Sequence, residues 1–390
     1  MFLGEKQIAS QVVEAPKDSG SFAREFNTIA QLDNDFFSVG SSSASEAVLS
    51  DSGKNSGFGG CEGKKTFKIG KKRVFSGREE KNEKGRGKPS AQKIIDKRAK
   101  RKGFSVVLAK SMIEYAKKSK SPMLGTYYRA LGCSDTLIQE DGKLHAQYCK
   151  SRICVVCGAI RTAKAMKAYL PVIRGWDSYL VTLTIPNVKG YLLRQTIDEM
   201  LKKFKGAQRS IKRKILFKGL RKVEVTYNPK RDDYHAHFHC VVDGFTQAQW
   251  LREEWMKRNP AARAVAQDVR KCNKKTLKEA FKYSMKILAS DEDNKNQNPH
   301  LYPHAVDTIV RALHKRRTYQ NFGFKLAKEF DEDDFDGEAL AAPDGNIEVG
   351  AVWTWIQEAH NWVNKATGEL LSEYKPSIRR LKFLERLDSG

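Results

Sequence analysis

The feature that most constrains the fold of this chain is a run of alternating histidines, His235, His237 and His239, in the segment HAHFHCVVD (235–243). Alternate residues of a β-strand point to the same face of a sheet. A strand here therefore presents three imidazoles together, while Phe238 points to the opposite face. The run predicts a strand with one apolar face and one histidine face, although the polar side of an edge strand would give the same pattern.

A second strand, residues 220–228 (LRKVEVTYN), precedes the histidines and is separated from them by the turn sequence NPKRDDY. If the turn of this hairpin centres near Arg231, Glu224 faces His237 or His239, because opposite residues of an antiparallel pair share a face. Two imidazoles and a carboxylate with open positions would hold a divalent cation. Mg²⁺ or Mn²⁺ there could polarise a phosphate; Zn²⁺ or Fe²⁺ would also fit this ligand set.

The rest of the central region reads as a mixture of helices and strands. Residues 179–187 (YLVTLTIPN) are β-branched and apolar and end in Pro-Asn, which predicts a buried strand followed by a turn. Apolar residues at helical spacing predict helices at 105–118, 191–217, 246–258, 274–289 and 301–329.

One of these helices carries groups suited to phosphate chemistry. Glu279 and Tyr283 are four residues apart and so share a helix face. A carboxylate beside a tyrosine could place a general base or a water near a phosphate, and Lys282 and Lys286 would favour the phenolate. A phenolate can attack a phosphodiester and form a covalent link. Many amphipathic helices carry Glu and Tyr at this spacing, so the helix alone does not establish the chemistry.

Four cysteines form a second constellation, Cys133-x15-Cys149-x4-Cys154-x2-Cys157. The C-x2-C end is typical of a structural zinc site, and tetrahedral thiolate coordination would fold a segment with little core of its own. His145 could replace Cys133 as the fourth ligand, but Cys133 is the preferred assignment.

The remaining cysteines, Cys61, Cys240 and Cys272, are isolated, and we expect them to be inert. Strand parity turns Cys240 away from the three histidines. No run of 18 apolar residues and no secretory signal is present, which predicts a cytoplasmic protein without a membrane contact. Metal binding is then a better explanation of clustered cysteines than disulfides.

Charge divides the chain into unequal parts. The formal net charge is +25, and residues 104–330 alone carry +24. Residues 63–103 hold 17 basic and 4 acidic residues, whereas the segments 1–62 and 331–390 are net acidic. Such a central block suggests a polyanionic partner, most often nucleic acid.

Composition and motifs together predict four parts. They are a disordered N-terminal region (1–103) with a basic arm (63–103), a helix with the cysteine cluster (104–170), a catalytic domain (171–330), and an acidic linker followed by a short helical appendage at 351–375 (331–390).

In combination, these segments resemble the plasmid rolling-circle replication initiators of the HUH endonuclease superfamily, in the branch with a cysteine cluster and a single tyrosine. The matching residues cover about 130–330. They are the strand LVTLTIPN (180–187), Glu224 with HAHFH (235–239), the helix EAFKYSMK (279–286), and Arg316-Arg317 with Phe322-Gly323.

The resemblance implies an α+β fold, with a central antiparallel sheet flanked by helices, the histidine strand in its middle and the tyrosine helix against it. It makes Glu224, His237 and His239 the metal ligands, with His235 beside them, and Tyr283 the nucleophile that nicks one strand of the plasmid origin. Glu279 would activate water for termination, and Lys286 would assist the tyrosine.

The same resemblance implies a bacterial cytoplasmic protein whose partners are origin DNA, a host helicase and the replication machinery. A helicase must come from the host because the chain has no P-loop pattern. A mobilisation relaxase or transposase with the same active site is an alternative, as is a non-catalytic zinc-containing DNA-binding protein.

Overall fold

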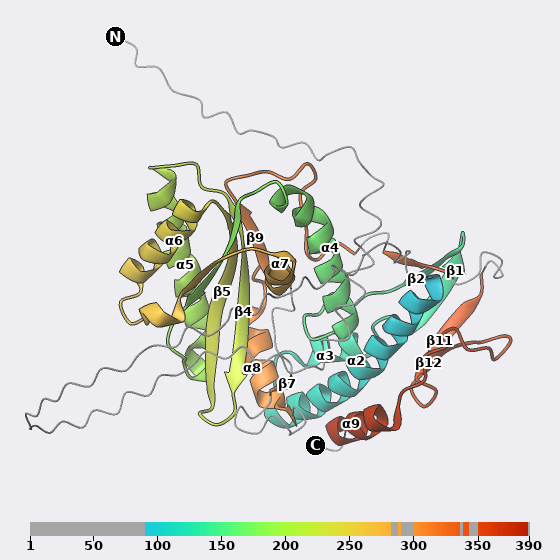
Figure 1. Cartoon of the computed structure of the whole chain (residues 1–390). Helices are drawn as coiled ribbons and strands as arrows, with labels where there is room; N and C mark the ends of the chain where they lie inside the picture. The colour runs from blue at the N-terminus through green and yellow to red at the C-terminus, as the bar shows by residue number, and fades with distance from the viewer. Residues whose placement is uncertain (1–89, 282–287, 290–299, 336–337, 343–349, 389–390) are drawn as a thin grey trace, which may run out of the picture.

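The computed structural model describes residues 90–281, 288–289, 300–335, 338–342 and 350–388. These residues form an α+β structure built around two five-stranded antiparallel sheets with flanking helices (Figure 1). The predicted fold class is confirmed. The N-terminal stretch that the sequence predicts to be disordered lies, up to residue 89, outside the described residues.

The larger sheet contains the histidine strand. Its strand order is β6 (Asp268–Lys271), β3 (Ser178–Thr184), β5 (Asp233–Asp243), β4 (Gly219–Asn228) and β9 (Tyr319–Phe322). Strand β5, which carries the histidines, is therefore in the middle, as predicted, and pairs antiparallel with β3 and β4.

Helices cover both faces of this sheet. Phe238 and the other even-numbered residues of β5 pack toward α5 (Leu193–Lys212) and α6 (Phe245–Arg258). The opposite face carries the histidines, and there Val241 packs with α4 (Val155–Ile173) and α7 (Lys274–Phe281). Figure 1 shows α5 and α6 on one side of the sheet and α4 and α7 on the other.

Gly219 opens strand β4 because no larger residue fits there. A Cβ atom at this position would lie 2.5 Å from the Phe322 ring and 2.6 Å from the Val241 carbonyl oxygen. The glycine lets β9 approach β4 closely and completes the edge of the sheet.

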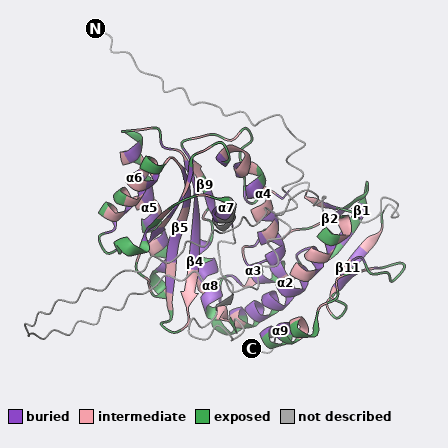
Figure 2. Ribbon diagram, viewed as in Figure 1, coloured by how far each residue is buried: buried purple, intermediate pink, exposed green. Residues whose placement is uncertain are grey.

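The smaller sheet joins segments that are far apart in the chain. Its strand order is β10 (Ala339–Ala341), β2 (Lys143–Ala146), β1 (Thr136–Glu140), β11 (Val352–Ile356) and β12 (Asn361–Asn364). It packs on the long helix α2 (Ala91–Ser119) through a separate core that includes Ile95, Leu137, Trp355 and Trp362. Figure 2 shows buried positions along α2 and on the neighbouring strand β11 of this sheet.

Shorter elements complete the structure. They are α3 (Leu124–Leu131), 3₁₀ turns at Gly190–Leu192 and Ala264–Ala266, the two-stranded ladder of β7 (Leu288–Ala289) and β8 (His300–Leu301), α8 (Pro303–Leu313) and α9 (Ile378–Asp388).

Three predicted helices are shorter than expected. The helix predicted at 191–217 ends at Lys212, and the one predicted at 301–329 ends at Leu313. In the latter, Lys315 has a positive φ of 60°, and Tyr319–Phe322 then forms β9. The helix predicted at 274–289 is wrong at Leu288–Ala289, which pairs as a strand with His300–Leu301.

The structure also differs from the predicted N-terminal boundary. Part of the predicted basic arm is helical, because α2 begins at Ala91, and the Ser90 hydroxyl accepts a hydrogen bond from the Lys93 backbone N–H. Ile95 and Ala99 are four residues apart and bury one face of this first part of the helix.

The predicted helical appendage at 351–375 is wrong, because it contains strands β11 and β12. Burial alternates along β11, with Trp353 and Trp355 inside, which is a strand period rather than a helical one. Within the predicted acidic linker, Glu332 is a buried, hydrogen-bonded residue.

Candidate functional site

Three of the predicted metal ligands lie together on the histidine face of the larger sheet. Glu224 pairs in register with His237, so the assumed hairpin turn gave the correct neighbour. The Glu224 carboxylate oxygens lie 3.8 Å from His237 Nε2 and 3.6 Å from His239 Nε2. An ion midway between the carboxylate and either ring would lie less than about 2 Å from both atoms, and metal–ligand bonds are typically ~2.1 Å long. One ion can therefore reach all three groups.

The other nitrogen of each imidazole is already engaged. His237 Nδ1 lies 3.3 Å from the backbone carbonyl oxygen of His235, and His239 Nδ1 lies 3.3 Å from Thr182 Oγ1. These contacts orient both rings so that Nε2 faces Glu224, an arrangement common at metal sites. His235 stacks on His237, with ring centroids 4.9 Å apart, and lies beside this group rather than within it.

The protonation states of the three groups suit the binding of a cation. Burial is the main cause that lowers the pKa of His237 and of His239 to about 4, so both rings are neutral at pH 7 and keep a free nitrogen lone pair. Burial alone would raise the pKa of Glu224, but the charge of Lys222 and its hydrogen bond to the carboxylate hold it well below its usual range. The carboxylate is therefore ionised.

Lys222 is a member of this site that the sequence reasoning missed. Its side chain is buried, and its Nζ donates a hydrogen bond to Glu224 Oε2 at 2.8 Å. On strand β4 it pairs with His239 on one side and with Tyr319 of β9 on the other. The sequence could have indicated Lys222, because a residue two positions before Glu224 on a strand lies on the same face of the sheet.

Helix α7 ends near the metal-ligand group, on the same face of the sheet. Phe281 is buried against Leu180, Leu220 and Val241, and its backbone carbonyl accepts a hydrogen bond from Tyr319 Oη at 3.2 Å. The backbone of Glu279 belongs to this helix. Tyr283 and Lys286, the predicted nucleophile and its helper, lie outside the described residues.

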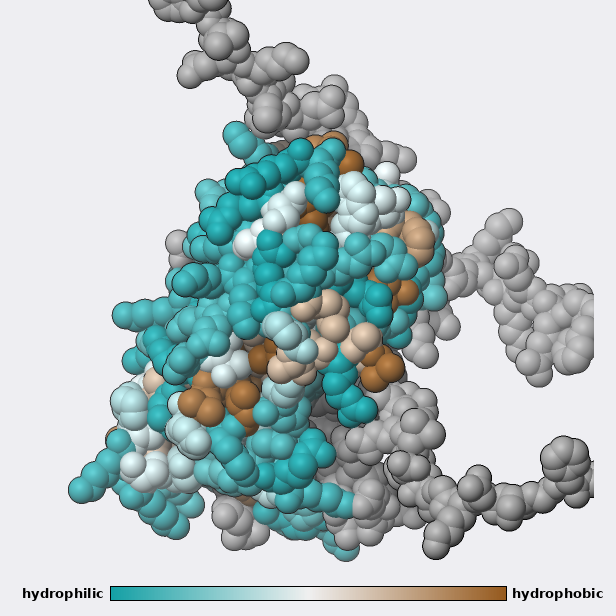
Figure 3. All heavy atoms as spheres, turned by 90° about the vertical axis from the view of Figure 1, so that its left-hand side faces the viewer, coloured by the Kyte–Doolittle hydropathy of each residue, from teal (hydrophilic) through white to brown (hydrophobic). Residues whose placement is uncertain are grey.

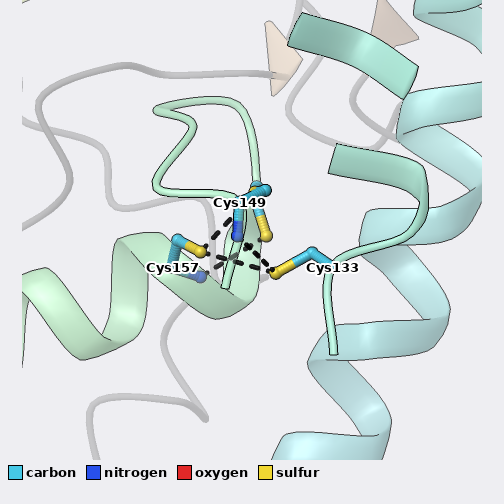
Figure 4. A group of neighbouring side chains, drawn as sticks. Cys133, Cys149 and Cys157 are labelled. Atoms are coloured by element: carbon cyan, nitrogen blue, oxygen red, sulfur yellow. Dashed lines mark hydrogen bonds between the residues drawn. The ribbon is translucent and has the colours of Figure 1, made fainter. Parts of the chain in front are cut away.

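The four predicted zinc ligands converge at a second site. Their sulfur atoms all lie within 4.8 Å of one another, and Cys157 Sγ is 3.5 Å from Cys133 Sγ and 3.6 Å from Cys149 Sγ. A tetrahedral ion with ~2.3 Å bonds to sulfur needs S···S separations of about 3.8 Å. Figure 4 shows three of these side chains pointing toward one another from two loops and the start of α4.

Cys154 supports the site from the N-cap position of α4. Its Sγ accepts a hydrogen bond from the Cys157 backbone N–H at 3.4 Å. Burial raises the pKa of the Cys154 thiol, but hydrogen bonds from Cys133, Cys149 and Cys157 lower it by more than burial raises it. The pKa therefore falls well below 9. A thiolate at this position is the form that binds metal. His145 lies in β2 and is not part of the group found among the described residues.

Helix α2 holds the first cysteine loop in place. The buried Lys102 Nζ donates hydrogen bonds to the carbonyl oxygens of Leu131 (3.0 Å) and Cys133 (2.7 Å) and also pairs with Asp135. Cys240 faces the apolar core on the α5 side of the larger sheet, away from the histidines, as predicted.

These features define an α+β protein with two candidate metal centres, one formed by histidine and glutamate on a central strand and one formed by four cysteines. A family model described as "Replication protein" matches residues 142–354, which include the histidine group and three of the four cysteines. The chain belongs to this replication protein family.

Curated relatives agree with this assignment, and each is called "Protein rep". One from Staphylococcus aureus is 30% identical over 177 residues, which is 39% of this chain and 76% of the relative. One from Streptococcus pneumoniae serotype 2 is 28% identical over 274 residues, or 60% of this chain and 83% of the relative. No solved structure shows significant similarity.

Within the part of the chain that the structure describes, no helix combines the length and the apolar character needed to span a bilayer.

Proposed function

We propose that this protein initiates rolling-circle replication of a plasmid by nicking one strand of the origin through Tyr283. The observation that supports this most strongly is the group Glu224, His237 and His239, which faces the same side of the sheet as α7. Membership of the replication protein family supplies the biological setting.

The donor set fits a divalent cation, Mg²⁺ or Mn²⁺, held by one carboxylate and two neutral imidazoles. When bound, such an ion supplies Lewis-acid polarisation of a phosphate oxygen. The chain's own contribution is orientation, because Thr182 and the His235 carbonyl fix the two rings, and Lys222 keeps Glu224 ionised.

Chain length supports the choice of Tyr283 as the nucleophile. Tyr283 follows Phe281 by two residues, and two residues span at most about 7 Å. The carbonyl of Phe281 is bonded to Tyr319, which pairs with Lys222 beside the metal ligands.

In the proposed step, Tyr283 Oη gives up its proton to solvent and forms a bond to phosphorus, and the bond from phosphorus to the 3′ oxygen breaks. The departing oxygen takes a proton and becomes the 3′-OH that primes synthesis, while the 5′ phosphate stays on the tyrosine. We assign Lys286 to stabilisation of the phenolate and Glu279 to activation of the water that ends the round. The cysteine site is assigned to structural Zn²⁺.

A covalent-adduct assay tests this function. Protein is incubated with Mn²⁺ and a labelled single-stranded oligonucleotide that spans the origin nick site, and the products are separated on a denaturing gel. We expect an adduct that is absent in Tyr283→Phe and reduced at least a hundredfold in His237→Gln, because the ion loses a ligand.

Tyr227→Phe and Tyr234→Phe serve as matched controls and should form the adduct normally. Persistence of the adduct in Tyr283→Phe, or its formation at full rate without divalent metal, would contradict the mechanism. A wild-type protein that binds the oligonucleotide without forming any adduct would favour a non-catalytic DNA-binding role.

A further inference from the structure

The exposed side of α5 carries a row of basic residues that the nicking site does not use. Lys202, Lys205, Arg209 and Lys212 are all exposed and follow one another at intervals of three, four and three residues. At 100° per residue these positions fall within one quarter of the helix circumference. With a rise of 1.5 Å per residue, the row is about 15 Å long.

Little negative charge offsets this row. The second half of α5, from Met200 onward, contains no acidic residue. Asp198, one turn earlier, already forms an ion pair with Arg316, whose Nε lies 2.8 Å from Asp198 Oδ1. Among the residues that the structure describes, none of the four basic side chains in the row forms an ion pair.

The row lies on the far side of the larger sheet from the metal ligands. Phe204 anchors α5 against Phe238, with ring centroids 5.4 Å apart, and Phe238 points away from the histidine face. Figure 3 looks onto this side of the molecule, where hydrophilic side chains cover most of the surface. One DNA segment cannot lie straight across both surfaces, because the sheet separates them.

We propose that this face of α5 binds the phosphate backbone of duplex DNA, separately from the single strand that is cut on the opposite face. The proposal rests on the proposed function for its choice of DNA. The duplex would be the part of the origin that flanks the nick site, and its binding would be independent of base sequence because the basic side chains meet phosphates.

Charge and packing favour a nucleic acid over other polyanions. A membrane-bound helix inserts its apolar face into lipid, but the apolar residues of α5 are buried in the core, as the exposures of Ile197, Phe204 and Ile211 show. A protein partner would require an apolar centre within the contact surface, and the basic row contains none. The cations repeat about every 4.5–6 Å along the helix and so present an extended line of positive charge to a phosphate backbone.

The test compares two variants in which the same amount of positive charge is removed. The first replaces the row, as Lys202→Gln, Lys205→Gln, Arg209→Gln and Lys212→Gln, and glutamine preserves helix propensity at these exposed sites. The control replaces four exposed lysines elsewhere, as Lys118→Gln, Lys143→Gln, Lys365→Gln and Lys375→Gln. Affinity for a fluorescent duplex of about 30 base pairs is measured by anisotropy across a salt series, without divalent metal.

We expect the row variant to bind the duplex roughly 10- to 1,000-fold more weakly at 0.1 M salt. Its slope of log K against log salt should be shallower by up to about 3.6, or ~0.9 for each phosphate that the variant no longer neutralises. The control variant should keep the wild-type slope. Adduct formation on a short single-stranded substrate should stay within about twofold of wild type, because the cut strand binds the other face.

Equal affinities of wild type and row variant, or equally weakened binding by the row and control variants, would overturn the proposal. Normal duplex binding by the row variant, together with weakened binding to anionic vesicles, would reassign the row to a membrane. Because duplex binding is measured without metal, a failure of the nicking chemistry leaves this result interpretable.

Discussion

Lys222 is a charged residue in a place where charge is costly. Its side chain is 1% exposed, and its described ion-pair partner is Glu224, which is itself buried. A buried pair of this kind adds little to stability as a pair, but removal of one partner leaves the other uncompensated. In this site a bound cation would supply the same compensation to Glu224 that Lys222 gives.

This reasoning predicts a metal-dependent stability defect. Without metal, Lys222→Met should lower the free energy of unfolding by about 3 kcal/mol, because Glu224 stays buried and loses the positive charge that compensates its carboxylate. Mn²⁺ should raise the melting temperature of this variant more than that of wild type, because the ion restores the missing positive charge. Thermal unfolding with and without Mn²⁺ measures both effects.

Lys218→Met provides the comparison, since Lys218 pairs with Asp243 at 2.9 Å near the surface, where pairs are worth about 0–1 kcal/mol. The double variant Lys222→Met with Glu224→Gln should recover most of the stability, because no unpaired charge remains. If Lys222→Met and Lys218→Met lowered the free energy of unfolding equally in metal-free buffer, the buried Lys222–Glu224 pair would be no more important to stability than a surface ion pair.

At the residue scale, strand parity made much of the site predictable. The positions of Glu224, His237 and His239 follow from alternation and from one assumed turn, and the direction of Cys240 follows from parity alone. The burial of Lys222 could not be predicted, because it depends on helices α4 and α7, which cover that face from elsewhere in the chain.

At the scale of elements, the acidic segment after β9 acts as an anchor. Glu332 accepts hydrogen bonds from the Thr318 backbone N–H at 2.8 Å and from Arg152 at 2.9 Å. Two residues of the same segment reach α4, where Arg161 donates to Asp333 Oδ1 at 2.8 Å and Lys164 pairs with Asp334. The segment thereby ties β9 of the larger sheet to the helix that follows the cysteine cluster.

We predict that Glu332→Ala lowers the free energy of unfolding by about 3 kcal/mol, because it strands a buried N–H group and the partly buried Arg152. Chemical denaturation with urea measures the change. Glu329→Ala removes the same charge from an exposed position and should change stability by less than about 0.5 kcal/mol. An effect of Glu332→Ala as small as that of the control would mean that the segment is only a connection.

The short strands were the elements that sequence patterns failed to predict. Composition suggested a linker and a helix for the last 60 residues, because acidic residues and glycines dominate the segment before Val352. The alternating burial of Trp353 and Trp355 was a strand signal that the helical interpretation overlooked. For β9, four residues are too few for any period to stand out.

At the scale of the whole molecule, the last strands of the chain are linked to the first cysteine. Trp362 of β12 is fully buried, and its indole Nε1–H donates a hydrogen bond to the carbonyl oxygen of Ser134 at 2.8 Å. Ser134 directly follows Cys133, so this bond connects β12 to the zinc-type site.

Two tryptophan variants should therefore differ. Trp362→Phe should lower the free energy of unfolding by about 1–3 kcal/mol and speed the release of zinc, since it removes the donor that holds the Ser134 carbonyl. Trp353→Phe should lower the free energy of unfolding by at least about 1 kcal/mol less than Trp362→Phe does, because the buried Trp353 Nε1 has no hydrogen-bond partner in the described part of the chain. Urea unfolding and a colorimetric zinc indicator measure the two effects, and equal destabilisation by both variants would contradict the proposed link.

The order of strands in the smaller sheet has a consequence for synthesis of the protein. Strands β1 and β2 lie between Cys133 and Cys149, but their outer neighbours β11 and β10 come about 200 residues later. At a translation rate of roughly 5–20 residues per second, the hairpin waits on the order of 10–40 s for them on the ribosome. All four cysteines have by then been made, so a metal can close their loop while both hairpin edges are still open to chaperones or to other nascent chains.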